Sequence, residues 1–180
     1  ANPIIRDAHN EATGAYNGIA IVKLMGRDSG FIAASAAISM PVVNFVLVPE
    51  MHFELEGENG FLETLKKRLD AKQHAVIVVA EGAGQNLFNK EGKEKVTDAS
   101  GNVQHDDIGL LLKNEIAEFF KEKDYEVTIK YIDPSYIIRS APANPGDSVF
   151  CSGLAYHALH GAMAGKTKFV VGRVNNQYVY

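Results

Sequence analysis

Cysteine is almost absent from this 180-residue sequence, and tryptophan is missing altogether. A single thiol, Cys151, excludes an internal disulfide and any metal site built from several cysteines, and it favours a reducing compartment. Long hydrophobic runs are also missing, because the longest, "PVVNFVLVP" and "AVIVVA", are too short to cross a bilayer. The first residues, "ANPIIRDAHNEA", lack the apolar core of a signal peptide. We therefore expect a cytoplasmic protein without a membrane partner.

An excess of positive charge is likewise missing. The 18 lysines and arginines are outnumbered by 22 acidic residues, for a net charge of −4. No basic footprint for nucleic acid follows from this balance, so we expect no nucleic-acid partner. With 46% hydrophobic and 22% charged residues, the composition is that of an ordinary globular protein, and the length suits one domain over residues 1–180.

Short β-branched runs alternate with helical patterns along the chain. Helical spacing occurs at about 31–39, 60–71, 107–122 and 147–164, with Asp147 or Ser148 as the expected cap of the last helix. The strand-like runs lie at 18–24, 44–49, 75–80, 126–132, 168–174 and 177–180. Because these runs are continuously apolar, the sequence predicts an α/β fold, Rossmann-like, with a mostly parallel sheet and helices on both faces. The polar stretch 84–106 is expected to be a long surface excursion.

Familiar ligand motifs are matched only in part. "HGAMAGKT" (160–167) has a histidine where a P-loop needs its first glycine, and it ends a helix where that loop should open one. "GAGQNL" (82–87) lacks the third glycine of a dinucleotide fingerprint, so a tight turn is the better interpretation. His157 and His160 are three residues apart with no carboxylate nearby in sequence. We therefore predict no metal ligands in this chain.

Polar residues follow three of the predicted strands. Gly26 and Arg27 come after the first strand, Glu81 ends the run "HAVIVVAE", and Tyr136 and Arg139 follow the strand at 126–132. Ligands bind at the carboxyl ends of parallel strands in α/β proteins. Guanidinium groups suit phosphate oxygens and a carboxylate suits sugar hydroxyls, so the set favours a sugar phosphate. For any one of these residues a surface ion pair is the alternative.

Long blocks of the chain resemble the 6-phosphofructokinase family, especially its plant and trypanosomatid branch. The resemblance is carried by "GIAIVKLMGRDSGFIAASAA", "VNFVLVPEMHFELEGENGFLETLKKRL", "HAVIVVAEGAGQ" and "DPSYIIRSAPANPGDSVFCSGLAYHALHGAMAG". It implies a phosphofructokinase carboxyl-terminal domain that binds fructose 6-phosphate for phosphorylation at its 1-hydroxyl in glycolysis. In this chain it implies substrate contacts from Met25, Gly26, Arg27, Glu81, Tyr136 and Arg139. It also makes Arg27 the candidate catalytic residue, steadying the transferring phosphoryl group.

Two motifs of that family are missing from the chain. The Gly-Gly-Asp donor motif does not occur, and "VTIKYID" has Lys130 where the family's Thr-Ile-Asp motif has its aspartate. We therefore expect a substrate-binding part that is inactive alone, with the amino-terminal part supplying ATP (or pyrophosphate) and Mg²⁺. The resemblance further implies a homo-oligomer, a dimer or tetramer. The competing hypotheses are a regulatory subunit that binds sugar phosphate without catalysis and a nucleotide-binding module built on "EGAGQ". No role is assigned to Arg173, for which a salt bridge is expected.

Overall fold

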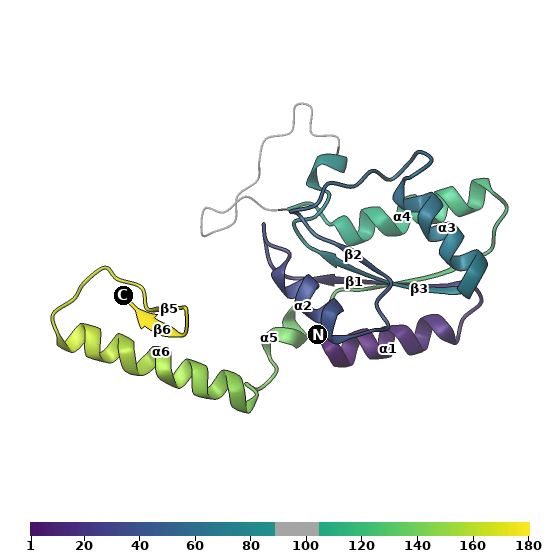
Figure 1. Ribbon diagram of the computed structural model, residues 1–180. Coiled ribbons are helices and arrows are strands. Elements are labelled where there is room, and N and C mark those ends of the chain that lie inside the picture. The colour runs from purple at the N-terminus through teal and green to yellow at the C-terminus, as the bar shows by residue number, and fades with distance from the viewer. Residues whose placement is uncertain (89–104) are drawn as a thin grey trace. The chain divides into compact units, whose positions relative to one another are not determined.

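The computed structural model describes residues 1–88 and 105–180, and these form two compact units. The first is Ala1–Arg139 and the second is Ser140–Tyr180. Figure 1 shows the helices and strands of both units. The single domain expected over 1–180 stays a prediction, and most of the expected excursion at 84–106 lies outside the described residues.

A four-stranded parallel sheet forms the centre of the first unit. Its strands are β1 (Gly18–Leu24), β2 (Phe45–Leu47), β3 (His74–Ala80) and β4 (Thr128–Ile132). Their order across the sheet is β2-β3-β1-β4, and every neighbouring pair runs parallel. The α/β fold with a mostly parallel sheet is thereby confirmed. The central strands β1 and β3 are almost entirely buried, which explains their continuous apolar sequences.

Helices cover both faces of this sheet (Figure 1). On one face, α1 (Asn2–Thr13) and α2 (Phe31–Ser39) pack on Ala20, Val22 and Val76. On the other face, α3 (Phe61–Lys72) and α4 (Ile108–Glu122) pack on Ile19, Ile21 and Ile77. Alternate residues of each strand therefore serve two separate cores.

Helix α1 was not among the predicted elements. Its buried stripe is short and small, consisting of Ile5, Ala8 and Ala12. The end of the helix lies close to the start of β1, because a Cβ added to Gly18 would lie 2.0 Å from the carbonyl oxygen of Ala12. Such a stripe has little apolar content, so periodicity alone gives a weak signal.

The second unit holds one helix and a hairpin. Helix α6 (Pro145–Met163) is followed by β5 (Gly172–Val174) and β6 (Gln177–Val179), which pair antiparallel. The strands at 168–174 and 177–180 therefore exist in shortened form, as a separate two-stranded sheet. The side chain that caps α6 belongs to Asn144, which accepts a hydrogen bond from the Asp147 amide at 2.8 Å, so the cap expected at Asp147 or Ser148 was wrong.

Aromatic contacts hold this hairpin to α6. The His157 ring stacks on Tyr178 with centroids 4.3 Å apart, and its Nδ1 lies 3.0 Å from the Tyr180 hydroxyl. Arg173 donates a hydrogen bond to Asn176 and lies over the Tyr178 ring. No carboxylate of residues 1–88 or 105–180 pairs with Arg173, so the structure shows no salt bridge for it there.

None of the helices described has the length and apolar character needed to cross a membrane.

Candidate functional site

Three neighbouring strands deliver the candidate residues to one edge of the sheet. Leu24 of β1 is in register with Ala80 of β3, and Val22 of β1 with Ile132 of β4. The strands thus end at nearly the same level, and the chain leaves them through Met25, Glu81 and the short helix α5 (Ser135–Arg139). The carboxyl edge of a parallel sheet is where α/β proteins bind ligands. The fold therefore brings segments more than 100 residues apart in sequence to adjacent positions.

The turn after β1 is held by Glu81. Its Oε1 accepts hydrogen bonds from the amides of Gly26, at 3.1 Å, and Arg27, at 2.7 Å. The Glu81 amide in turn donates to the carbonyl of Leu24 at 2.9 Å. Gly26 (φ +152°) and Arg27 (φ +53°) both have positive φ, and in this turn their two amides converge on the one oxygen. One carboxylate thus fixes the backbone on which the Arg27 side chain is mounted.

Gly82 lets the strand end of β3 approach this turn. A Cβ at Gly82 would lie 2.0 Å from the Arg27 carbonyl oxygen and 3.3 Å from the Asp28 Cα. Only glycine fits such a backbone contact without displacement. The Ala-Glu-Gly sequence therefore supplies both the carboxylate that binds the turn and the space the turn occupies.

The start of α2 is bound mainly by a carboxylate from a distant part of the chain. The Gly30 amide donates to Glu50 Oε1 at 2.8 Å, while Ser29 Oγ accepts from the Phe31 amide at the long distance of 3.4 Å. The Asp28 carboxylate lies 3.2 Å from His105 Nε2. Sequence reasoning missed Glu50 because it lies 20 residues further along the chain than Gly30.

Tyr136 and Arg139 lie on α5 (Ser135–Arg139), a single turn that follows β4. The Arg139 guanidinium carbon is 5.8 Å from the centre of the Tyr136 ring. Both side chains are exposed, with Tyr136 81% accessible. One short helix thus carries an exposed phenol and an exposed guanidinium just beyond the carboxyl end of β4.

A charged cluster behind this edge was not foreseen. Lys23 of β1 lies 3.1 Å from Asp107 and 3.0 Å from Asp133, and Asp107 also accepts a hydrogen bond from the Tyr131 hydroxyl at 2.8 Å. Burial tends to raise the pKa of both carboxyl groups, but hydrogen bonds have the larger combined effect and hold each pKa below its usual range. At Asp107 these hydrogen bonds come chiefly from Tyr131 and Lys23, and at Asp133 from Lys23 and Ser135. The sequence contained one signal of this cluster, because a lysine inside the apolar run "GIAIVKL" needs acidic partners when its strand is buried.

The remaining motif candidates make other contacts in the structure. His160 lies against the Tyr156 ring on α6. Gln85, in the single 3₁₀ turn η1 (Gln85–Leu87) of the "EGAGQ" stretch, donates to the carbonyl oxygens of Glu81 and Asp106. Across the part of the chain that is described, His, Cys, Asp and Glu form no cluster of three or more suited to a metal ion.

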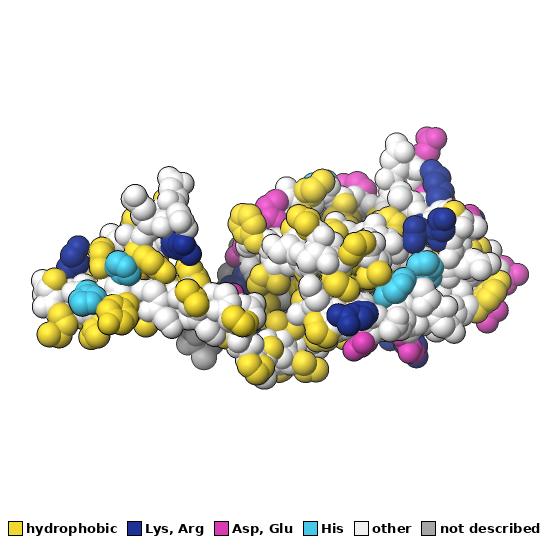
Figure 2. All heavy atoms as spheres, turned by 60° about the horizontal axis from the view of Figure 1, so that its bottom comes forward, with side chains coloured by type: hydrophobic (Ala, Val, Ile, Leu, Met, Phe, Trp, Pro, Cys, Tyr) yellow, Lys and Arg dark blue, Asp and Glu magenta, His cyan; other side chains and the backbone are white. Residues whose placement is uncertain are grey.

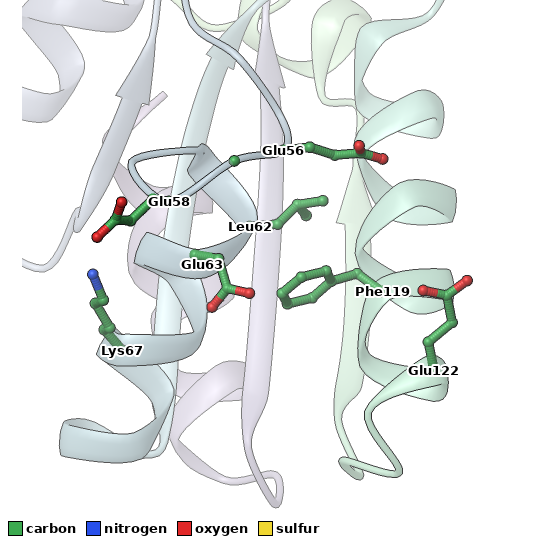
Figure 3. Close-up of a pocket in the computed structure, with 8 residues that line it drawn as sticks. Glu56, Glu58, Leu62, Glu63, Lys67, Phe119 and Glu122 are labelled. Carbon is green, nitrogen blue, oxygen red and sulfur yellow. The ribbon is translucent and has the colours of Figure 1, made fainter.

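An open hollow of about 570 Å³ lies between α3 and α4, and none of the six candidate residues lines it (Figure 3). Its walls carry four glutamates against one lysine, which disfavours an anionic ligand. Its labelled lining residues are Glu56, Glu58, Leu62, Glu63, Lys67, Phe119 and Glu122.

The fold is that of an α/β protein, and the ends of its parallel strands carry the candidate ligand site. The family model described as "Phosphofructokinase" matches residues 2–162, so the chain belongs to the phosphofructokinase family. The resemblance noted from the sequence is thus confirmed.

Curated relatives carry the same family name. The chain is 53% identical to the ATP-dependent 6-phosphofructokinase of Borreliella burgdorferi over 98% of its own length and 40% of that protein. It is 46% identical to ATP-dependent 6-phosphofructokinase 2 of Arabidopsis thaliana over 100% of its length and 41% of that protein. The chain therefore spans about 40% of the length of these relatives.

Solved structures agree in fold. The pyrophosphate-dependent phosphofructokinase of Marinobacter aquaeolei superimposes with a TM-score of 0.64 at 19% identity, covering 98% of this chain and 41% of that one. A Pichia pastoris phosphofructokinase in the T-state gives 0.63 at 17% identity, covering 99% and 17%. At such identities the likeness concerns the fold alone.

Proposed function

We propose that this chain is the fructose 6-phosphate-binding part of a 6-phosphofructokinase. The observation that supports this most is the Glu81-bound turn at residues 25–27, built at the carboxyl edge of the sheet in a chain of this family. The intact enzyme transfers a phosphoryl group to the 1-hydroxyl of the sugar. The oxygen–phosphorus bond to that hydroxyl forms, the bond to the donor's leaving oxygen breaks, and a base outside this chain takes the hydroxyl proton.

Each candidate residue has a distinct role in this proposal. Arg139 and Tyr136 bind near the 6-phosphate, because a guanidinium offers parallel donors to phosphate oxygens. Glu81 uses Oε1 for the turn amides, and a carboxylate retains enough acceptor capacity for a sugar hydroxyl as well. Met25 and the Gly26 backbone line the sugar, and Arg27 stabilises charge on the transferring group.

The phosphoryl donor is bound by the remaining part of the protein. The names of the Borreliella and Arabidopsis relatives favour ATP over pyrophosphate. Mg²⁺ would accompany the donor and neutralise its phosphates. No metal ligand is assigned to this chain.

Its partners are the upstream part of the same polypeptide and further copies of the enzyme, as a dimer or tetramer. Helix α6 exposes apolar side chains along its length, including Val149, Tyr156, Leu159 and Met163. Figure 2 shows hydrophobic side chains gathered on this second unit. A monomeric protein rarely leaves such a surface uncovered, and we assign its cover to the upstream part. The single exposed thiol of Cys151 suits a cytoplasmic location.

The test is a coupled assay for fructose 1,6-bisphosphate with the full-length protein. We expect product from fructose 6-phosphate with Mg²⁺ and ATP, and no product from the 180-residue chain alone. Fructose 6-phosphate binding without turnover by either donor would favour a regulatory subunit instead. Turnover by the isolated chain at an enzymatic rate would contradict the proposed division of the site.

A further inference from the structure

Lys23 is the one charged residue in the otherwise apolar strand β1, and it joins two elements of the sheet edge. Only 15% of its side-chain surface is exposed. Its ammonium lies 3.1 Å from Asp107, which caps α4, and 3.0 Å from Asp133, which follows β4. A mostly buried lysine between two carboxylates is costly to assemble, so its position calls for a reason.

The two carboxylates depend on Lys23 to different degrees. Asp107 accepts hydrogen bonds from the amides of Gly109 and Leu110, at 3.0 and 3.1 Å, and from the Tyr131 hydroxyl. The cap of the 15-residue helix α4 therefore has its own support. Removing Lys23 would leave these three donors in place.

Asp133 has fewer hydrogen-bond partners than Asp107, and the helix that follows it, α5, is much shorter than α4. Its Oδ1 accepts from the Ser135 amide at 3.2 Å, at the first residue of α5. Helix α5 is only five residues long, and the amide of Ile138 donates to the Pro134 carbonyl at 3.0 Å. A single turn is not stable by itself, so its direction depends on the residues that fix its first turn. Lys23 fixes Asp133, and Asp133 fixes the start of α5.

The same helix carries Tyr136 and Arg139, and β1 ends at Leu24, so the turn at 25–27 begins two residues after Lys23. Lys23 thus connects the strand that bears the Arg27 turn with the helix that bears the other guanidinium. The groups around Lys23 are Tyr131 of β4, Asp133 just after β4, and Asp107 at the cap of α4.

We propose that Lys23 is a positioning residue for fructose 6-phosphate: through Asp133 it holds α5 so that Tyr136 and Arg139 face the ligand together with the turn at 25–27. This inference rests on the proposed function. Lys23 itself contacts no substrate. Its loss should impair binding of the sugar phosphate and leave binding of the donor unchanged.

The test uses steady-state kinetics of the full-length enzyme with Lys23→Met, which keeps the apolar stem and removes the charge. We expect the KM for fructose 6-phosphate to rise about tenfold, which corresponds to the loss of one hydrogen bond between charged groups. The kcat and the KM for the donor should stay within about twofold of the wild-type values, because only sugar-phosphate binding is affected. Lys23→Arg should restore the KM, because it returns the cation. A merely structural role would lower thermal stability in Lys23→Met without this selective change in KM.

Two aspartate variants distinguish the ion pair of Lys23 with Asp133 from its ion pair with Asp107. Asp133→Asn keeps an oxygen for the Ser135 amide and loses the charge that Lys23 binds, so it should raise the same KM. It also carries the test if Lys23→Met does not fold. Asp107→Asn is the matched control, and its KM should stay within about twofold of wild type. An unchanged KM in Asp133→Asn, or an equal rise in both aspartate variants, would overturn the inference. Failure of the wild-type enzyme to phosphorylate fructose 6-phosphate would instead count against the proposed function.

Discussion

The Arg27 amide donates to Glu81 Oε1 at 2.7 Å, across 54 residues of sequence. The Gly26 amide shares the same oxygen. The Glu81 carboxylate therefore holds the backbone of the turn in place, in addition to its proposed contact with the sugar. Substitutions at Glu81 should affect both the turn and the ligand.

Replacing Glu81 by alanine removes the acceptor for two amides. We expect the free energy of unfolding to fall by about 1–3 kcal/mol relative to Glu81→Gln, which keeps an acceptor oxygen of the same reach. The KM for fructose 6-phosphate should rise in the alanine variant. Urea denaturation and steady-state kinetics of the full-length enzyme measure the two effects. Equal stability of the two variants would show that the turn does not depend on this side chain.

Gly82→Ala should disturb the turn without touching any candidate side chain. The added Cβ would meet the Arg27 carbonyl oxygen at 2.0 Å, so the backbone of the turn must move. We expect kcat/KM for fructose 6-phosphate to fall more than tenfold. Gly172→Ala is the control, because the nearest atom to its added Cβ is 3.8 Å away. A normal kcat/KM in Gly82→Ala would mean that the exact path of this turn is unimportant.

His9 should make the first unit less stable in mild acid. Burial, with smaller contributions from the neighbouring His74 and Arg68, lowers the pKa of His9 below its ordinary value. The unfolded chain therefore binds a proton more readily than the folded one, so His9 contributes stability above the unfolded pKa of about 6.5 that is lost as the pH falls through the folded value. His9→Gln should reduce the loss of stability between pH 7.5 and 5.5.

Urea midpoints at the two pH values measure this difference. The neighbouring exposed residue offers a control, Asn10→Gln, which changes α1 without removing a titrating group. If His9→Gln and Asn10→Gln show the same pH dependence, the His9 assignment is wrong.

Much of the fold could be predicted because the strands are continuous apolar runs. The bounds of β1 match the predicted 18–24, since apolar residues occupy every position of this strand except Lys23 and glycines lie close to both of its ends. The run at 168–174 shows the limit of this reasoning. Strand propensity does not say which strand is the partner, and β5 pairs with β6 in a separate hairpin.

The site was predictable in part for a related reason. Position at a strand end placed Arg27, Glu81 and Arg139 on the candidate edge without any knowledge of the sheet order. The contact between Glu81 and the turn amides was beyond sequence reasoning, because it depends on the positive φ of Gly26 and Arg27. Lys23 was overlooked because its partners, Asp107 and Asp133, lie more than 80 residues further along the chain.

The most direct measurement is the affinity of the full-length protein for fructose 6-phosphate by calorimetry, with Arg139→Ala beside the wild type. The account predicts at least a tenfold loss of affinity, since a guanidinium that binds phosphate is removed, and an unchanged affinity for the phosphoryl donor. Arg6→Ala, at an exposed position of α1, should bind like the wild type. Wild-type affinity for fructose 6-phosphate in Arg139→Ala would contradict the claim that this sheet edge is the sugar-phosphate site.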